Sequence, residues 1–320
     1  MTQNDYEKLY TQGANKLKTS FFSFKFSPDY LGAVDNFTDA AKGFRKIGLA
    51  SKAVVSFQKA IECNKHLNDS WSEGNCYLAI AEIYFFDAKK MDEGIENLKK
   101  ASYCYQVAGK FNQSAKAFNS IADKFMENNE FNNAKRVLKE AFELCESNTE
   151  DKLIAGTFEP IYNKLLDVTC GLLQWGEAID FTQKYINAMK KYPDNEKYRI
   201  SKTYMKLCIL RMINKEEYMC DDIFMKMINN NYEDTQSDIA DVEKCLKAVK
   251  NLDKKSFNSC VSSSFILFEN NLLKGLQNLY KEKEEANKNK GVQDNIQEDD
   301  NIINTNSKNN NIKDDEDDLK

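Results

Sequence analysis

One feature limits the fold of this chain more than any other, a helical unit that returns about every forty residues. The clearest copy spans residues 131–142, where apolar side chains at spacings of three and four cover one face of an α-helix. Ala134 and Ala141 lie seven residues apart on that face, and their small side chains let a neighbouring helix approach closely. The position of Ala134 recurs at 53, 94 and 178 and, weakly, at 218. Such a period is typical of arrays of helical pairs.

This period predicts an all-α, TPR-like right-handed solenoid of antiparallel helix pairs. Only three prolines and twelve glycines interrupt 320 residues, and the connections are short, with Gly48 and Gly109 as helix-ending signals. Short connections between helices of similar length make neighbours antiparallel. We expect the repeated helices at about 49–66, 90–107, 130–146, 174–191 and 215–229, and their partners at about 29–46, 70–87, 110–127, 152–172 and 196–212.

Three parts of the chain are expected. Residues 1–236 hold the solenoid, with an N-terminal hydrophobic loop at 19–28 where the helical period is lost. Residues 237–285 form a C-terminal helical bundle that covers the open face of the last repeat. Residues 286–320 contain five lysines, nine acidic residues and nine asparagines, a composition that cannot bury enough apolar surface to fold, so a disordered acidic tail is expected.

The sequence offers no sign of catalysis or of a cofactor. None of the usual nucleotide-binding, protease or hydrolase motifs occurs, and one histidine with nine scattered cysteines cannot supply zinc-site spacing. We expect reduced cysteines in the core of a cytosolic protein. The net charge of −5 argues against nucleic-acid binding. No apolar run is long enough to span a bilayer, and the N-terminus lacks the pattern of a signal peptide.

Two segments could meet partners or membranes. Four phenylalanines beside Lys18 and Lys25 could enter a bilayer surface while the lysines meet anionic headgroups, or they could fold back as core, and the residues favour neither reading. They are Phe21, Phe22, Phe24 and Phe26. At the other end, Leu319 follows five acids that include Asp317 and Asp318. This end either solubilises the chain or fits a basic groove on a partner.

Basic residues also recur along the repeats. They are ordinary solvated surface, or, if the solenoid curves, they line up and grip an elongated acidic partner. The candidates are Lys110, Lys116, Lys135, Arg136 and Lys139.

Taken together, these segments resemble the soluble NSF attachment proteins (SNAPs), adaptors that couple the ATPase NSF to SNARE complexes. Residues 16–26 resemble the family's N-terminal hydrophobic loop, and 28–44 are most similar to its γ branch. Residues 109–122 resemble a helix of the α branch, with Lys116 at the position of a SNARE-contacting lysine. Residues 317–320 resemble the α-type terminus, whose penultimate leucine stimulates NSF. A second SNARE-contacting lysine would fall near 156–164 and is not assigned, and the Asn-rich spacer resembles neither branch.

The resemblance implies a non-enzymatic adaptor for SNARE disassembly in vesicle fusion and intracellular protein transport. Its expected partners are a syntaxin-type SNARE complex, NSF and a membrane surface, on which it would be peripheral in the secretory pathway. The chain would be a monomer alone, with several copies in the complex. Two rivals remain: a TPR-type scaffold for short peptides without a membrane role, and an enzyme that uses a reactive cysteine.

Overall fold

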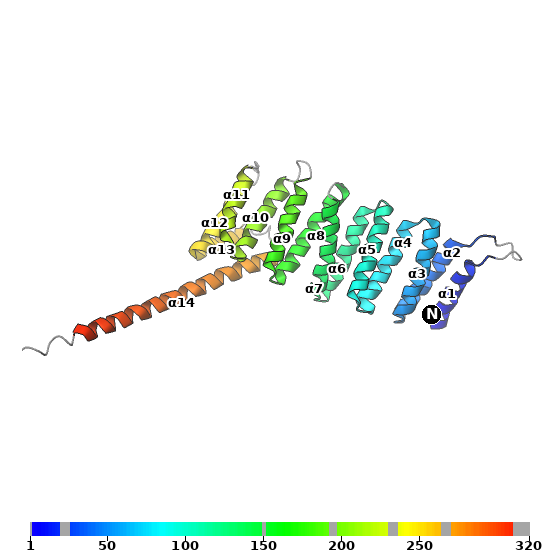
Figure 1. The fold of residues 1–320 in the computed structure, drawn as a ribbon, viewed down its shortest axis with the longest axis horizontal. Coiled ribbons are helices and arrows are strands. Elements are labelled where there is room, and N and C mark those ends of the chain that lie inside the picture. Colours follow the sequence, from blue (N-terminus) through cyan, green and yellow to red (C-terminus); the bar gives the residue numbers. More distant parts are fainter. Residues whose placement is uncertain are drawn as a thin grey trace, which may run out of the picture. The chain divides into compact units, whose positions relative to one another are not determined.

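The computed structural model describes residues 2–19, 26–148, 152–191, 197–229, 236–263 and 270–309. Within these ranges the chain is helical and contains no strand (Figure 1). The helices are α1 (Gln3–Lys16), α2 (Tyr30–Lys46), α3 (Ala50–Leu67), α4 (Ser70–Glu82), α5 (Met91–Val107), α6 (Phe111–Glu127), α7 (Phe131–Ser147), α8 (Lys152–Gly171), α9 (Trp175–Met189), α10 (Lys197–Ile213), α11 (Cys220–Asn229), α12 (Gln236–Asn251), α13 (Lys254–Ser263) and α14 (Asn270–Asn309). A π-helical turn, η1 (Ile83–Asp87), follows α4, and a 3₁₀ turn, η3 (Glu217–Met219), precedes α11.

These elements confirm the all-α fold of consecutive helix pairs. The predicted partner helices correspond to α2, α4 with η1, α6, α8 and α10, and the repeated helices to α3, α5, α7, α9 and α11. Helices that follow one another pack together, most extensively α2 with α3 and α4 with α5. Positive φ angles end several of the helices, at Gly48 and Gly109 as expected and also at Asn68 and Asn129.

The small residues of the repeat lie where helices touch. Ala53, Ala134 and Ala178 are fully buried, and a Cβ atom on Gly94 would overlap the ring of Phe85. In the fifth, weak copy of the repeat, only the expected register at position 218 is wrong. Tyr218 lies in η3 with 78% of its surface exposed, because a tyrosine does not fit where the other repeats place a methyl group or a hydrogen atom.

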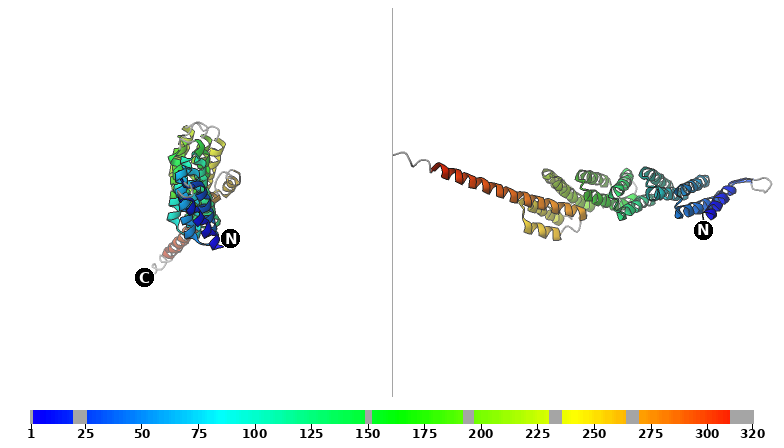
Figure 2. Two further views of the ribbon diagram at one scale, coloured as in Figure 1. Left: turned by 90° about the vertical axis from the view of Figure 1, so that its right-hand side faces the viewer. Right: turned by 90° about the horizontal axis from the view of Figure 1, so that it is seen from below.

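The chain divides into two compact units. Unit 1 comprises residues 1–174 and 180–196, and unit 2 comprises 175–179 and 197–320. The end of the repeats at residue 236 stays a prediction. The first helices of unit 1 share a core of apolar side chains contributed by α1 to α4 and η1. Figure 2 gives two further views of these elements.

Unit 2 contains helices that pack against one another. Helices α12 and α13 pack together, and α10 packs against α12 and α14. The ring of Tyr280 stacks on Phe257 with centroids 4.3 Å apart, and its hydroxyl donates to the carbonyl of Leu252. Gly275 lies against Trp175 and Ile213, where a larger side chain would collide.

Helix α14 continues to Asn309, into the segment 286–320 that we expected to be disordered. Lysine and glutamate around 281–290 are good helix formers, so local propensity favours a helix even where the sequence offers little to bury. Residues 310–320 lie outside the described part of the chain, and for them disorder stays a prediction.

Candidate partner-binding surfaces

The even-numbered helices of unit 1 form one row that is tied together by ion pairs. Arg45 on α2 contacts Glu82 on α4 at 2.9 Å and Asp87 in η1 at 2.8 Å. Glu82 also accepts from Lys124 on α6 at 2.6 Å. Further along, Lys164 on α8 reaches Asp123 on α6 at 2.5 Å. We call the exposed side of α2, α4, α6 and α8 the even face.

The odd-numbered helices form a second row with its own ion pairs. Lys52 on α3 reaches Glu7 on α1 at 2.6 Å, and Lys99 on α5 reaches Glu140 on α7 at 2.7 Å. Arg136 on α7 contacts Asp92 at the start of α5 at 2.5 Å. We call the exposed side of α1, α3, α5 and α7 the odd face. These ion pairs join helices within one row, while Lys65 on α3 reaches Glu73 on α4 across the rows at 3.7 Å. We describe the exposed sides of the two rows as separate surfaces.

Glu82 of the even row is held by two cations, Arg45 and Lys124. Burial by itself would raise the pKa of this carboxyl, but hydrogen bonds from Arg45 and Lys124 outweigh burial and leave the pKa lowered. Its side chain is 23% exposed, less than that of either cationic partner. The carboxylate therefore acts as a fixed anion between three successive helix pairs.

Lys116 lies in the middle of the exposed side of α6. The side chains at 114, 115, 117 and 118 are buried, while Lys116 is exposed and forms no ion pair with any residue that the structure describes. Lys110, at the N-cap of the same helix, is also exposed and has no such pair. A free ammonium group on the even face can meet an acidic partner without first giving up an internal contact.

The three basic residues of α7 belong to the other row. Lys139 is exposed, Arg136 is held by Asp92, and Lys135 is half-buried and donates to the amide oxygen of Gln174 at 2.6 Å. The five predicted basic residues therefore do not share one surface. Lys110 and Lys116 lie on α6 in the even row, and the other three on α7 in the odd row.

Lys164 marks a basic position that sequence reasoning left unassigned. It lies on α8 in the even row, where it donates to Asn119 at 2.8 Å as well as to Asp123. The separation in sequence between Lys164 and Asp123 is 41 residues, close to one repeat. This contact could have been predicted from the sequence, because two opposite charges lie about one repeat apart.

The two terminal segments are only partly described. Phe26 is 69% exposed, just before Asp29 caps α2 by accepting from the amide of Gly32. The other three phenylalanines of the predicted loop, Phe21, Phe22 and Phe24, lie outside the described residues. So does the predicted acidic end with Asp317, Asp318 and Leu319.

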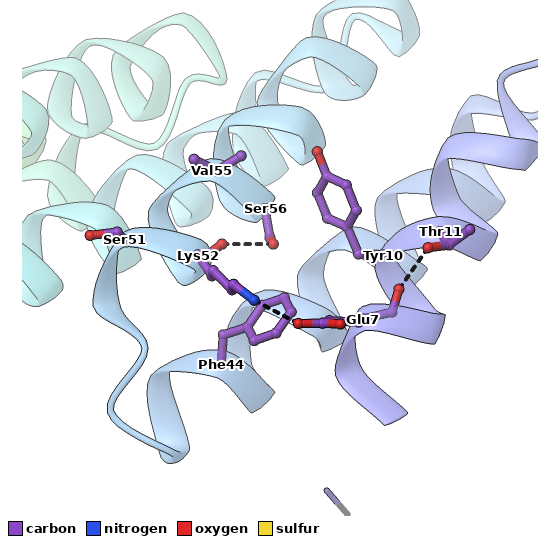
Figure 3. Close-up of a pocket in the computed structure, with 8 residues that line it drawn as sticks. All are labelled: Glu7, Tyr10, Thr11, Phe44, Ser51, Lys52, Val55 and Ser56. Carbon is purple, nitrogen blue, oxygen red and sulfur yellow. Dashed lines mark hydrogen bonds and ion pairs between the residues drawn. The ribbon is translucent and has the colours of Figure 1, made fainter. Parts of the chain in front are cut away.

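Hollows occur on both faces of unit 1, and no pattern in the sequence indicated them. One of about 480 Å³ lies between α1 and α3 on the odd face, with Phe44, Tyr10 and Val55 as apolar lining (Figure 3). The ammonium of Lys52 lies 5.6 Å from the centroid of the Phe44 ring while it is paired with Glu7. Another, of about 670 Å³, lies between α2 and α4 on the even face.

The cysteines are unpaired and buried. Burial raises the pKa of most of these thiols, to about 12 for Cys76 and Cys145. Cys220 differs because a hydrogen bond with Cys208 lowers its pKa. Among the described residues no group of histidine, cysteine or acidic side chains could hold a metal ion. In the same part of the chain, no helix combines the length and apolarity needed to cross a membrane.

Comparison with known proteins gives one strong match. A family model described as "Soluble NSF attachment protein, SNAP" matches residues 4–264. No curated protein sequence matches significantly. The crystal structure of BtubC (BKLC) from P. vanneervenii is similar at 15% identity and a TM-score of 0.32, covering 70% of this chain and 90% of its own. The Pseudomonas aeruginosa pilF structure is similar at 14% identity and a TM-score of 0.30, covering 79% and 99%. At these TM-scores neither structure carries a functional argument.

Proposed function

The chain belongs to the soluble NSF attachment protein family, and on that premise we propose that it is an adaptor which binds SNARE complexes and recruits the ATPase NSF for their disassembly. Family membership supports an adaptor role in general, and it does not favour a TPR-type peptide scaffold. The single observation that carries the proposal is the match across residues 4–264. The physical logic is multivalency, because weak contacts to a membrane, a SNARE bundle and an ATPase act together.

We assign the SNARE contact to the even face, around Lys116 and Lys110. Both ammonium groups are exposed and without an ion pair among the described residues, which keeps their charge available for an acidic bundle. Exposed charge pairs are screened by salt, so capture should weaken as ionic strength rises. Lys135, Arg136 and Lys139 would form a second basic surface on the odd face.

The two ends of the chain supply the other proposed contacts. The phenylalanines at 21, 22, 24 and 26 would hold the protein at a membrane surface as a peripheral protein of the secretory pathway. Asp317, Asp318 and Leu319 would engage NSF. Several copies of a protein that is monomeric alone would surround one SNARE bundle.

Disassembly is the direct test of this proposal. Purified protein is added with NSF and ATP to a soluble SNARE complex, and the loss of the complex is followed over time. Disassembly that depends on the added protein is the expected result. If NSF dismantles the complex no faster with the protein than without it, the adaptor function is wrong.

Two matched variants separate the faces. Lys116→Glu and Lys139→Glu each reverse one exposed charge, the first on α6 and the second on α7. In a pull-down with SNARE complex we expect Lys116→Glu to weaken capture about tenfold, as loss and reversal of one interfacial charge does, and Lys139→Glu to bind as the parent does. Unchanged capture by Lys116→Glu would remove that residue from the SNARE contact, and loss with Lys139→Glu alone would move the contact to the odd face.

A further inference from the structure

Exposed apolar side chains gather at one end of the helix pairs in unit 1. Because successive helices alternate in direction, the ends of α1, α3 and α5 and the starts of α2, α4 and α6 lie at the same end (Figure 1). Six large hydrophobic side chains are exposed there, three of them with about two thirds of their surface in solvent. We call this set the apolar edge: Phe26, Leu31, Leu67, Trp71, Tyr103 and Val107.

The opposite end of the same helices has a different character. Its exposed large hydrophobic residues among the described part of unit 1 are Ile47, Phe131 and Leu173. Between them lie many charges of both signs: Arg45, Lys46, Asp87, Lys89, Lys90, Asp92, Glu93, Glu127 and Glu130. Charged side chains occur at both ends, so the difference lies in the exposed large hydrophobic side chains, six at the apolar edge and three at the opposite end. A gathering of such side chains marks a partner or a membrane.

The acidic groups of the apolar edge are already engaged. Asp29 pairs with Lys16 at 3.5 Å and caps α2, and Asp69 caps α4 by accepting from the amide of Ser72. Glu73 is 15% exposed and pairs with Lys65 at 3.7 Å. By contrast Lys18 and Lys110 are exposed and form no ion pair within the described residues. Lys18 and Lys110 are therefore positive charges that this edge leaves available, beside the exposed Asp35 in the second turn of α2.

We propose that the apolar edge is a bilayer-contacting surface that binds membranes containing anionic phospholipid. Three observations favour a bilayer over a protein. The edge begins at Phe26, the last residue of a segment with four phenylalanines in six positions. Trp71 and Tyr103 are the residue types enriched at membrane–water interfaces. The apolar side chains follow a line across the ends of four helices, α2 to α5, and the segment before α2, a surface that a flat partner covers best.

This inference extends the membrane contact under the proposed function and rests on it. The phenylalanine segment alone would tether the protein by a single point. The apolar edge adds a line of contacts from α2 to α5, so the helix pairs of unit 1 would stand with their axes steep to the bilayer. Most of the binding would come from apolar burial, because Lys110 belongs to the proposed SNARE contact and Lys18 is left as an unpaired positive charge for the membrane within the described residues.

Vesicle binding by full-length variants tests the edge. In Leu31→Ser/Tyr103→Ser/Val107→Ser all three replaced side chains are more than half exposed, so folding should be kept. We expect its partition onto vesicles of phosphatidylcholine and phosphatidylserine to fall about tenfold, since interfacial binding scales with buried apolar area. The matched control, Ile47→Ser/Phe131→Ser/Leu173→Ser at the opposite end, should bind like the parent. Equal partition of the two triple variants would overturn the proposal.

Trp71 supplies a second readout that does not depend on a destabilising change. The chain has two tryptophans, so Trp175→Phe leaves Trp71 as the only one. On vesicles, its emission should move to shorter wavelength and its quenching by acrylamide should fall. If the protein binds vesicles through Phe21 and Phe22 while Trp71 stays as accessible as in solution, the edge is refuted and the phenylalanine contact stands. The adaptor function is judged separately, by disassembly of soluble SNARE complexes.

Discussion

At Gly94, α5 lies so close to the preceding π-helical turn that an added methyl group would overlap the ring of Phe85. The same position of the repeat is alanine at 53, 134 and 178, each fully buried. Side-chain volume at this one position therefore controls how closely the helices of unit 1 can approach their neighbours.

Gly94→Ala should lower the free energy of unfolding by about 1–3 kcal/mol, the usual cost of forcing extra volume into a packed contact. Gly176→Ala in α9 is the matched control, since nothing lies within 4 Å of its added Cβ atom. That variant should be neutral or slightly stabilising, because alanine is the better helix former. Chemical denaturation measures both, and an unchanged midpoint for Gly94→Ala would contradict the close contact.

Thiol chemistry gives a second prediction at the residue scale. Burial raises the pKa of Cys104 to about 11 and that of Cys245 to about 12, while the hydrogen bond with Cys208 lowers the pKa of Cys220. Native protein at neutral pH should therefore react slowly with a thiol reagent, with Cys220 first, and all nine cysteines should react after denaturation. Rapid labelling of any other cysteine in the native protein would revive the reading as an enzyme with a reactive thiol.

Pairs of helices are joined along each row by charges that lie one repeat apart in the sequence. Arg45 and Glu82 are 37 residues apart, Glu82 and Lys124 are 42 apart, and Glu7 and Lys52 are 45 apart. Such spacing places both partners at equivalent points of neighbouring pairs. In the even row, the carboxylate of Glu82 on α4 accepts from both Arg45 on α2 and Lys124 on α6. A substitution at Glu82 therefore probes how strongly these three helices are coupled.

Glu82→Gln should lower the free energy of unfolding at pH 7 by about 1–2 kcal/mol, because two half-exposed cations lose a charged acceptor. The folded-state pKa of Glu82 lies below its ordinary value of 4.5, so this stabilisation is present above pH 4.5 and disappears as the pH falls through the lower folded value. The difference between parent and variant should shrink accordingly in acid. Glu96→Gln, which affects an exposed pair with Lys100 on one helix, should change stability little at any pH.

For the molecule as a whole, the period of the sequence predicted most helices and their order, because burial of one face repeats with the helix. It also separated the two rows, since the repeated helices form the odd row and their partners the even row, but it did not show that the exposed lysines of the two rows lie on separate surfaces. An exposed lysine looks the same in sequence on either row, so Lys116 and Lys139 were grouped although they lie on different faces. The period also placed Tyr218 wrongly at a buried position of the repeat. The pattern of apolar residues did not show that Tyr218 lies in η3 and is exposed.

Membrane anchoring gives the prediction at this scale. Phe21→Ser/Phe22→Ser should slow disassembly of membrane-anchored SNARE complexes severalfold and leave soluble complexes unaffected, because the loop would add a membrane contact to the multivalent assembly. Disassembly rates on vesicles and in solution are compared for parent and variant. An equal loss on both substrates would show that the two phenylalanines serve the fold or another partner and not the membrane.

The spacing of the charged pairs has a consequence for how such a chain can change over generations. In the repeat region of unit 1, each of these contacts joins a helix to its counterpart in the neighbouring pair, so no contact depends on the total number of pairs. If one whole repeat were duplicated or deleted, each charged side chain would still find an opposite charge at the equivalent position of the next helix pair. Length is then a trait that evolution can adjust in steps of about forty residues, matching the reach of the adaptor to the dimensions of what it must hold.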